Sequence, residues 1–266
     1  MNATLTIALI QNAAGANTAT NLHRLDTLLK HVSDVDLIAL PEVFAARGGD
    51  DDLRRAAQPL TGDTVQWLRS LASERKAWVL GGSVMELDGD RIFNTSVLIN
   101  RAGDIAAGYR KIHLFEVHLE DGKTVREADV YSGGDTPVMV DIEGWKCGLS
   151  ICYDLRFPEL YRHYAKHGCD LLFIPSNFTQ RTGKDHWNVL VRARAIENQC
   201  FVIAPGQCGI MPGHEIETHG HSMAVGPWGE VLCEAEQSET VLVTSLDPKE
   251  LAATRARVPA LDHRRL

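Results

Sequence analysis

Residues 36–41 (DLIALP) and residues 170–175 (DLLFIP) are two versions of one pattern. Each is an apolar run of strand length that ends at a proline and is followed by a polar residue, which is typical of a strand buried on both faces of a sheet. The next strand-like run in each half also matches, because residues 78–80 (WVL) correspond to residues 201–203 (FVI). The chain therefore contains an internal repeat, which predicts two sheets of similar topology.

Outside the repeat, strand-length apolar runs alternate with segments of helical period. Residues 4–11 are predicted to form a strand, and an apolar stripe lies on the helix that follows, at Leu22, Leu25, Leu28 and Leu29. Two sheets with helices on one face each can stack and bury both inner faces in one core. We therefore predict an α+β fold, a four-layer α-β-β-α sandwich with internal pseudo-duplication. Because no linker-like stretch interrupts it, we expect a single domain over residues 1–266.

The composition and charge exclude some classes of function. The chain has 266 residues, of which 44% are hydrophobic, enough to fill a sizeable core. Its 27 Lys and Arg against 35 Asp and Glu give a net charge of −8, so the broad attraction that nucleic acid or an anionic membrane requires is missing. Residues 1–12 lack the basic start of a signal peptide, and no segment reaches the length of a membrane span. We expect a cytoplasmic protein with no nucleic-acid or membrane partner.

The cysteines contain no C-x-x-C pair, which favours reduced thiols. Cys152 differs from the rest because it lies where a predicted strand, residues 147–151, meets a helix that Pro158 can begin. Such a turn exposes one side chain at the carboxyl end of a sheet, although a cysteine there is more often a packing residue. Neighbouring Ser150 is the third residue of a G-x-S-x-G pattern that begins at Gly148 and fails at its last position, and we interpret Ser150 as a core residue. The other cysteines are interpreted as small buried side chains: Cys147, Cys169, Cys200, Cys208 and Cys233.

Two further segments carry candidate groups. Glu42 comes directly after the run at residues 36–41, where the position favours a general base; the alternative is a solvated loop glutamate. Lys111 follows Tyr109 and Arg110 and precedes an alternating apolar pattern, whose ordinary interpretation is an edge strand with a basic cap.

Taken together, these three segments resemble the nitrilase superfamily of carbon-nitrogen hydrolases, and the resemblance covers essentially the whole chain. It implies that Glu42 is the general base, Lys111 the oxyanion stabiliser and Cys152 the nucleophile. It also implies a second glutamate that orients the lysine, for which Glu127 is the best match. The Lys111 ammonium would favour the thiolate, and the tetrahedral oxygen would be held by Lys111 and the backbone N–H of Tyr153. No metal or organic cofactor is required.

Within the superfamily, Cys152-Tyr153-Asp154 looks like the amidase branches rather than the true nitrilases. Residues 192–200 (RARAIENQC) and 227–230 (PWGE) are similar to the deaminated glutathione amidases, which hydrolyse the amide that links a 2-oxoglutaryl group to Cys-Gly. The alternatives are an omega-amidase acting on 2-oxoglutaramate or another small carboxylate amide, and an N-carbamoyl amidase.

Arg156 matches a position that binds substrate carboxylate in amidase and carbamoylase relatives, and its alternative is a structural ion pair with Glu159 or another acid. Asn177 stands where close relatives commonly have alanine, so it could narrow or repolarise the pocket. The expected partner is a small amide that carries a carboxylate. The resemblance also implies a homodimer or higher homo-oligomer, formed through the helix near residues 158–167.

Two other interpretations stay open. His214, His219 and His221 include the H-x-H spacing of two metal ligands, but no third ligand lies at a standard spacing, so loop histidines are the simpler interpretation. A catalytically silent binding or scaffold protein could keep the same fold. The presence of Glu42, Lys111 and Cys152 argues against it.

Overall fold

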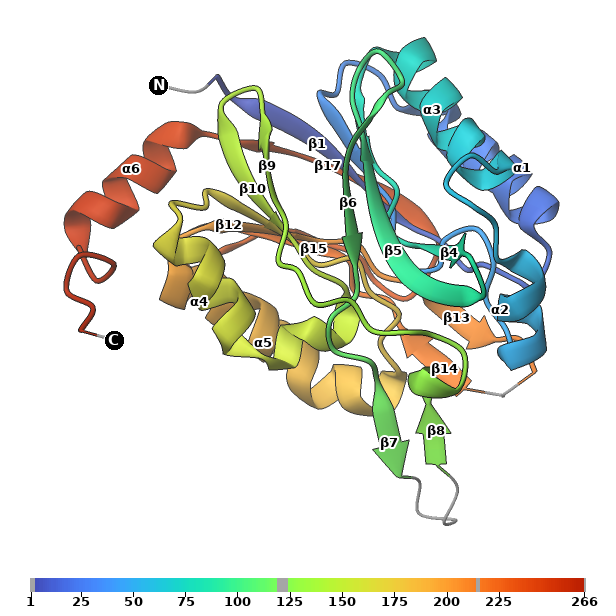
Figure 1. Ribbon diagram of the computed structural model, residues 1–266. Helices are drawn as coiled ribbons and strands as arrows, with labels where there is room; N and C mark the ends of the chain where they lie inside the picture. Colours follow the sequence, from blue (N-terminus) through green and yellow to red (C-terminus); the bar gives the residue numbers. More distant parts are fainter. Residues whose placement is uncertain (1–2, 119–123, 214–215, 266) are drawn as a thin grey trace.

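Two stacked β-sheets with helices on their outer faces make up the computed structural model, which describes residues 3–118, 124–213 and 216–265 (Figure 1). The first sheet has the strand order β17-β1-β2-β3-β5-β4, and β6 pairs with β5. Its strands are β1 (Leu5–Gln11), β2 (Leu37–Ala39), β3 (Trp78–Leu80), β4 (Val84–Asp88), β5 (Arg91–Ile99), β6 (Ile105–Arg110) and β17 (Thr240–Leu246).

The second sheet has the strand order β16-β15-β12-β11-β10-β9. Its strands are β9 (Met139–Ile142), β10 (Trp145–Leu149), β11 (Leu171–Phe173), β12 (Phe201–Ala204), β15 (Met223–Val225) and β16 (Val231–Glu234). In the first sheet β1, β2 and β3 are parallel, with β17 and β5 antiparallel at either side; in the second, β10, β11 and β12 are parallel, with β9 and β15 antiparallel. The predicted repeat is confirmed, since β2 and β11 occupy equivalent places.

The helices cover the outer faces, with α1 and α3 against the first sheet and α4 and α5 against the second (Figure 1). Their bounds are α1 (Thr18–Leu28), α2 (Asp50–Ala56), α3 (Asp63–Arg75), α4 (Pro158–Lys166), α5 (Gln180–Asn198) and α6 (Pro248–Arg257), with 3₁₀ turns η1 (Leu29–His31), η2 (Glu127–Asp129) and η3 (Cys152–Arg156). The predicted apolar stripe holds at Leu25, which packs in one cluster with Leu68 of α3 and with Ile38 and Val79 of the sheet. Asn17 is a typical N-cap residue, since its side chain accepts the Thr20 N–H at the start of α1.

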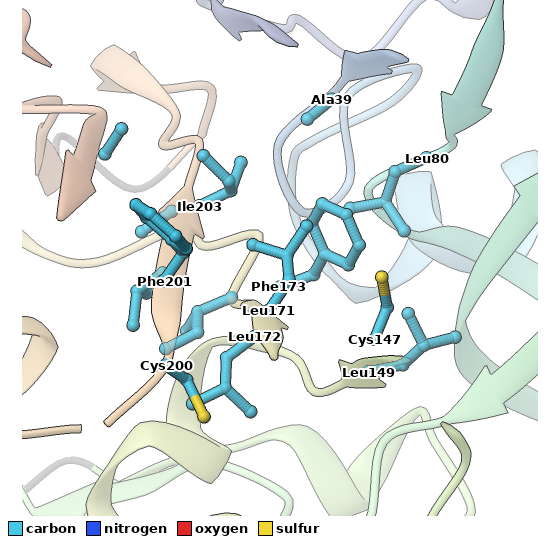
Figure 2. Packing of buried hydrophobic residues seen from close by; sticks show 14 of the residues in the cluster. Ala39, Leu80, Cys147, Leu149, Leu171, Leu172, Phe173, Cys200, Phe201 and Ile203 are labelled. Atoms are coloured by element: carbon cyan, nitrogen blue, oxygen red, sulfur yellow. The ribbon is translucent and has the colours of Figure 1, made fainter. Parts of the chain in front are cut away.

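The main core lies between the two sheets (Figure 2). Ala39 and Leu80 come from the first sheet, and Leu149, Phe173 and Ile203 come from the second, all of them fully buried. Burying one such leucine, isoleucine or phenylalanine side chain contributes about 1.5–3 kcal/mol, so this layer strongly favours a single stacking of the sheets. The carboxyl ends of β2, β10 and β11 are thereby held at fixed positions relative to one another.

Two small hairpins lie outside the sheets: β7 (Glu116–His118) with β8 (Thr124–Arg126), and β13 (Cys208–Met211) with β14 (Ile216–His219) (Figure 1). Within the described residues, no helix is long and apolar enough to span a bilayer.

Candidate active site

Cys152 lies at the turn between β10 and α4. It is the first residue of η3, its φ is +47°, and its backbone N–H donates to the carbonyl of Pro175, 2.9 Å away, beyond the end of β11. A side chain in this left-handed region costs on the order of 1–2 kcal/mol, so the surrounding structure must impose it. Pro158 begins α4 as predicted. The turn therefore places the thiol at the carboxyl ends of two parallel strands.

Glu42 follows β2 and is held in place by its backbone. The next residue, Val43, has a φ of +50°, and its N–H donates to the Ser83 hydroxyl at 3.0 Å. Gly82 packs directly against this turn, where an added Cβ would lie 1.9 Å from the carbonyl oxygen of Pro41. Only glycine fits there, so β3 and its following loop fix the direction of Glu42.

The Glu42 side chain is 3% exposed and accepts hydrogen bonds on both oxygens. Oε1 accepts from Lys111 Nζ at 2.8 Å and from Asn94 Nδ2 at 2.9 Å, and Oε2 accepts from the backbone N–H of Asn177 at 2.8 Å. The interpretation of Glu42 as a solvated loop residue is therefore wrong.

Lys111 follows the last residue of β6, and its side chain is 1% exposed. Its Nζ donates to Glu42 at 2.8 Å and to Glu127 at 2.9 Å, and Glu127 in turn accepts the Phe115 N–H at 2.7 Å. Burial lowers the pKa of Lys111, but the carboxylates of Glu127 and Glu42 more than offset it and raise the pKa well above its ordinary value. Lys111 is therefore an ammonium at neutral pH.

The Cys152 thiol has a pKa well above its ordinary value, because burial and the nearby Glu42 carboxylate disfavour the thiolate more strongly than Lys111 favours it. Lys111 therefore favours the thiolate, as the resemblance implies, but does not by itself produce it. The carboxylates of Glu42 and Glu127 share the Lys111 ammonium, so the charge around the thiol disfavours a further anion. A base must therefore accept the thiol proton during the reaction.

Asp154 joins the cysteine turn to the lysine segment. It is fully buried; Oδ2 accepts from the Tyr109 hydroxyl at 2.7 Å and from the Ile151 N–H at 2.8 Å, while Oδ1 accepts from the His113 N–H at 3.0 Å. Tyr109 and His113 lie on either side of Lys111 in the sequence. The carboxylate therefore fixes the position of the ammonium relative to the thiol.

A cavity of about 690 Å³ opens onto these groups, with Cys152, Glu42, Lys111 and Glu127 in its lining. Much of the rest of the wall is apolar, and part of it comes from Met211 and Ile216 of the β13–β14 hairpin. The other apolar residues of the wall include Val43, Leu53, Phe115 and Phe178. A concave apolar pocket with a few convergent polar groups is the usual form of a small-molecule site.

Comparison with known proteins identifies the family. The family model for carbon-nitrogen hydrolases matches residues 6–256. The chain belongs to the carbon-nitrogen hydrolase family. As a member of this family it is a hydrolase that acts on carbon-nitrogen bonds other than peptide bonds, in linear amides.

Amidases are among the relatives of this carbon-nitrogen hydrolase. A deaminated glutathione amidase of Synechocystis sp. is 38% identical over 264 residues, 97% of each chain. Omega-amidase NIT2 of Bos taurus is 35% identical over 265 residues, 99% of this chain and 96% of the relative. The crystal structure of Saccharomyces cerevisiae Nit3, a member of branch 10 of the nitrilase superfamily, matches with a TM-score of 0.88 and 32% identity, over 99% of this chain and 97% of Nit3. The predicted nitrilase-type sandwich and the amidase class are confirmed.

Three other predicted residues also line the hydrolase pocket: Tyr153, Arg156 and Asn177. The Arg156 guanidinium lies over the rings of Tyr153 and Phe178, at 5.7 and 5.3 Å from their centroids, and 3.3 Å from His186 Nδ1. Within the described part of the chain it forms no ion pair with Glu159 or another acid, so the alternative of a structural pair is not what the structure shows. Tyr153 is the second residue of η3, where a helical turn offers its N–H no acceptor.

Three residues around this site were not predicted from the sequence: Asn94, Asp154 and Arg47. Asn94 donates to Glu42 through its side chain, while its carbonyl accepts the Lys111 N–H at 2.8 Å. The signal for it was a run of buried polar residues inside the otherwise apolar β5. Asp154 stood out only as part of the Cys-Tyr-Asp motif, and Arg47 gave no local signal.

The histidines predicted as possible ligands do not form a metal site in the described residues. His219 Nδ1 contacts Gln180 Oε1 at 2.7 Å, and His221 Nδ1 contacts Glu234 Oε1 at 3.0 Å. The two imidazole rings stack with centroids 4.3 Å apart, and burial lowers the pKa of His219 to about 4. Among residues 3–118, 124–213 and 216–265, no group of three His, Cys, Asp or Glu side chains could hold a metal ion. His214 lies outside the described residues.

Proposed function

We propose that this carbon-nitrogen hydrolase cleaves the amide of a carboxylate-bearing 2-oxo acid, with deaminated glutathione, 2-oxoglutaramyl-Cys-Gly, as its substrate. One observation carries the proposal: the continuous contact of Glu42, Lys111 and Glu127 beside the buried thiol of Cys152, at one end of a large cavity. These groups match the needs of amide hydrolysis through a thioester.

In the first half of the reaction, Cys152 Sγ bonds to the amide carbon as Glu42 takes the thiol proton. The protonated thiol of the resting site makes this transfer necessary. Negative charge then develops on the carbonyl oxygen, where the Lys111 ammonium and the Tyr153 N–H donate hydrogen bonds. Each such donor is worth about 3 kcal/mol of transition-state stabilisation.

In the second half, the carbon-nitrogen bond breaks as Glu42 returns the proton to the departing amine, which leaves a thioester on Cys152. Glu42 then accepts a proton from water, whose oxygen attacks the thioester carbon. The carbon-sulfur bond breaks, the sulfur regains a proton and the free acid departs. Glu127 keeps Lys111 charged and in place throughout.

The size of the cavity favours the larger substrate. A volume of about 690 Å³ is in the range of pockets for drug-sized ligands. 2-Oxoglutaramate, with a handful of heavy atoms, would leave much of the apolar wall uncovered, whereas the Cys-Gly portion of deaminated glutathione extends along it. Omega-amidase activity and N-carbamoyl amidase activity are therefore the alternatives.

Arg156 supplies charge for the acid portion of the substrate. Its guanidinium lines the pocket on the turn that carries the nucleophile and has no carboxylate partner among the described residues. A guanidinium fork can donate two parallel hydrogen bonds to one carboxylate. We assign it to the 2-oxo-acid carboxylate.

The test compares kcat/KM for deaminated glutathione, 2-oxoglutaramate and an N-carbamoyl amino acid. Deaminated glutathione should be preferred by at least about 10-fold, since each missing group in a pocket costs at least that much. A higher kcat/KM for 2-oxoglutaramate would make the protein an omega-amidase instead.

The alternative of a silent binding protein needs a separate experiment. Iodoacetamide titration with peptide mapping should label Cys152 before Cys147, Cys169 and Cys200, because its thiol lines the pocket whereas those three are fully buried. Labelling of Cys152 ahead of the part-exposed Cys233 would show that Glu42 activates the thiol. Equal labelling of all cysteines together with no turnover would favour the silent protein.

The proposal also includes a single domain over residues 1–266, association into a homodimer or higher homo-oligomer through α4, and a cytoplasmic location. Analytical ultracentrifugation tests the association. A monomer at micromolar concentration would contradict it.

A further inference from the structure

Arg47 is a buried cation in the pocket wall with no acidic partner among the described residues. Its side chain is 2% exposed and lines the same cavity as Glu42. By contrast Arg194, which is 5% exposed, forms an ion pair with Glu197 at 2.7 Å. Glu239 acts on Arg47 only at longer range and is itself bound to Arg24.

The partners of Arg47 are neutral oxygens. Nε donates to the Ala14 carbonyl at 3.0 Å, Nη2 to the Cys208 carbonyl at 3.0 Å and the Ile210 carbonyl at 3.3 Å, and Nη1 to the Thr218 hydroxyl at 3.1 Å. The longest contact, 3.5 Å, joins Nη1 to Asn177 Oδ1, which also lines the pocket. These contacts orient the guanidinium without neutralising it.

The charge on Arg47 remains in the folded protein. Burial lowers its pKa to about 10, so the group is still a cation at neutral pH. A buried charge without a counter-charge is unfavourable, and an anion that enters the cavity would compensate it.

Tyr131 provides an independent observation in the same cavity. Its side chain is 5% exposed and lines the cavity, yet its hydroxyl has no hydrogen-bond partner among the described residues. The ring packs in one cluster with Val43 and Ala46, which belong to the segment that carries Arg47. A buried hydroxyl is normally paired, so this one is available to a ligand.

Arg47 is connected to the group that is proposed above to protonate the departing amine. It contacts Asn177, whose N–H donates to Glu42 Oε2 at 2.8 Å, and on this ground we assign Arg47 to the amine side of the scissile bond. Arg156 lies instead on the turn after Cys152, to which the acyl group becomes attached.

We propose that Arg47 binds a carboxylate on the amine portion of the substrate, and that the Tyr131 hydroxyl donates a hydrogen bond to that same portion. The inference rests on the proposed function and narrows it: the departing amine is an amino acid or short peptide with a free carboxyl terminus, rather than ammonia.

The experiment compares deaminated glutathione with its analogue in which the glycine carboxylate is a carboxamide. Wild-type enzyme should prefer the acid by at least about 30-fold in kcat/KM, the loss expected when one partner of a buried charge pair is removed. Arg47→Met should bring this preference close to 1, mainly through KM for the acid. Arg47→Lys should restore part of it.

The matched control is Arg194→Met, which removes a buried arginine that does not line the cavity. Arg194→Met should change kcat/KM for the acid and for the carboxamide by the same factor. Arg47→Met would do the same if Arg47 were only structural. Equal losses on both substrates in the Arg47 variants would overturn the inference.

Two outcomes separate this inference from the proposed function. If wild-type enzyme cleaves neither substrate, the proposed function fails and the inference fails with it. If it cleaves both equally well, the proposed function stands and the inference is wrong.

Tyr131→Phe decides the question if the Arg47 variants do not fold. It removes only an unpartnered hydroxyl, so the melting temperature should hold while KM for deaminated glutathione rises about 5-fold, the loss of one hydrogen bond. An unchanged KM would show that the hydroxyl does not contact the substrate, and would overturn the subsite.

Discussion

The ammonium of Lys111 lies 2.8 Å from the carboxylate of Glu42, and both side chains are almost completely buried. The two residues are 69 positions apart in the chain and follow different strands of the first sheet. Desolvation makes such a pair a poor source of stability compared with apolar side chains of the same volume. Its presence at the pocket therefore points to chemistry.

Lys111→Met should lower kcat at least about 100-fold with a smaller change in KM, because the ammonium acts on charge that appears in the transition state. It should also reduce the free energy of unfolding by about 3–5 kcal/mol, since the carboxylates of Glu42 and Glu127 lose their cation. Urea unfolding of Lys111→Met, Glu42→Gln and the double variant gives the coupling free energy between Lys111 and Glu42. A change confined to KM would make Lys111 a substrate contact, and additive losses of stability would deny the coupling.

Cys152→Ala should abolish turnover and remain folded, because the thiol forms the covalent bond. Cys152→Gly should be equally inactive but more stable than Cys152→Ala by about 1 kcal/mol, since alanine stays in the left-handed backbone region and glycine is unstrained there. Rapid-quench mass spectrometry should find the acyl adduct on Cys152 of wild-type enzyme. An adduct on another cysteine would relocate the nucleophile.

Asp154→Asn should lower kcat by at least about 10-fold while KM changes little, because Asp154 positions Lys111 relative to the thiol without contacting the substrate. Tyr109→Phe, which removes a single hydrogen bond to Asp154, should cost about 1 kcal/mol of stability and less activity. The comparison uses kcat and thermal unfolding of both variants. Full activity in Asp154→Asn would mean that the carboxylate serves only the fold.

Alkaline pH should destabilise the protein. Burial raises the pKa of Cys147 and Cys152 well above their ordinary value of 9.0, so the folded state retains thiol protons that the unfolded chain releases. The free energy of unfolding should therefore fall above about pH 9, by about 1.4 kcal/mol per pH unit for each such thiol. Urea unfolding between about pH 7.5 and about pH 10.5 measures the slope. Cys147→Ala, outside the site, should reduce the slope, and an unchanged slope would mean that the buried Cys147 thiol does not contribute to it.

Arg156→Met should reduce affinity for amides that carry the 2-oxo-acid carboxylate by about 2–5 kcal/mol. Arg156→Lys should recover only part of this loss, because an ammonium cannot match the guanidinium fork. The rate of thiol alkylation by a small uncharged electrophile should stay near the wild-type rate. The measurement pairs each amide with its analogue that lacks this carboxylate. If affinity for both members of a pair falls by the same factor, Arg156 supports the turn that carries Cys152 instead.

The sequence predicted those structural features whose signal lies in a few neighbouring residues. The apolar runs at residues 36–41 and 170–175 predicted the equivalent strands β2 and β11, and Pro158 predicted the start of α4. Glu42, Lys111 and Cys152 stood out by their places beside predicted strands, and their roles came from a resemblance. The structure brings all three to one cavity.

What could not be predicted depends on contacts between distant segments. Asp154 contacts Tyr109, 45 positions away, and Arg47 contacts Thr218, 171 positions away. Neither contact can be recognised from the neighbouring residues in the sequence. The raised pKa of the Cys152 thiol was not predicted, because its burial, which only the assembled site reveals, outweighs the effect of the nearby ammonium.

The stacking of the two sheets has a practical consequence. Glu42 and Lys111 follow strands of the first sheet, whereas Cys152 follows β10 of the second, so the groups meet only when the layer that contains Leu80 and Phe173 is closed. Turnover therefore reports assembly of the fold: during refolding, release of the amine product should begin when the two sheets dock.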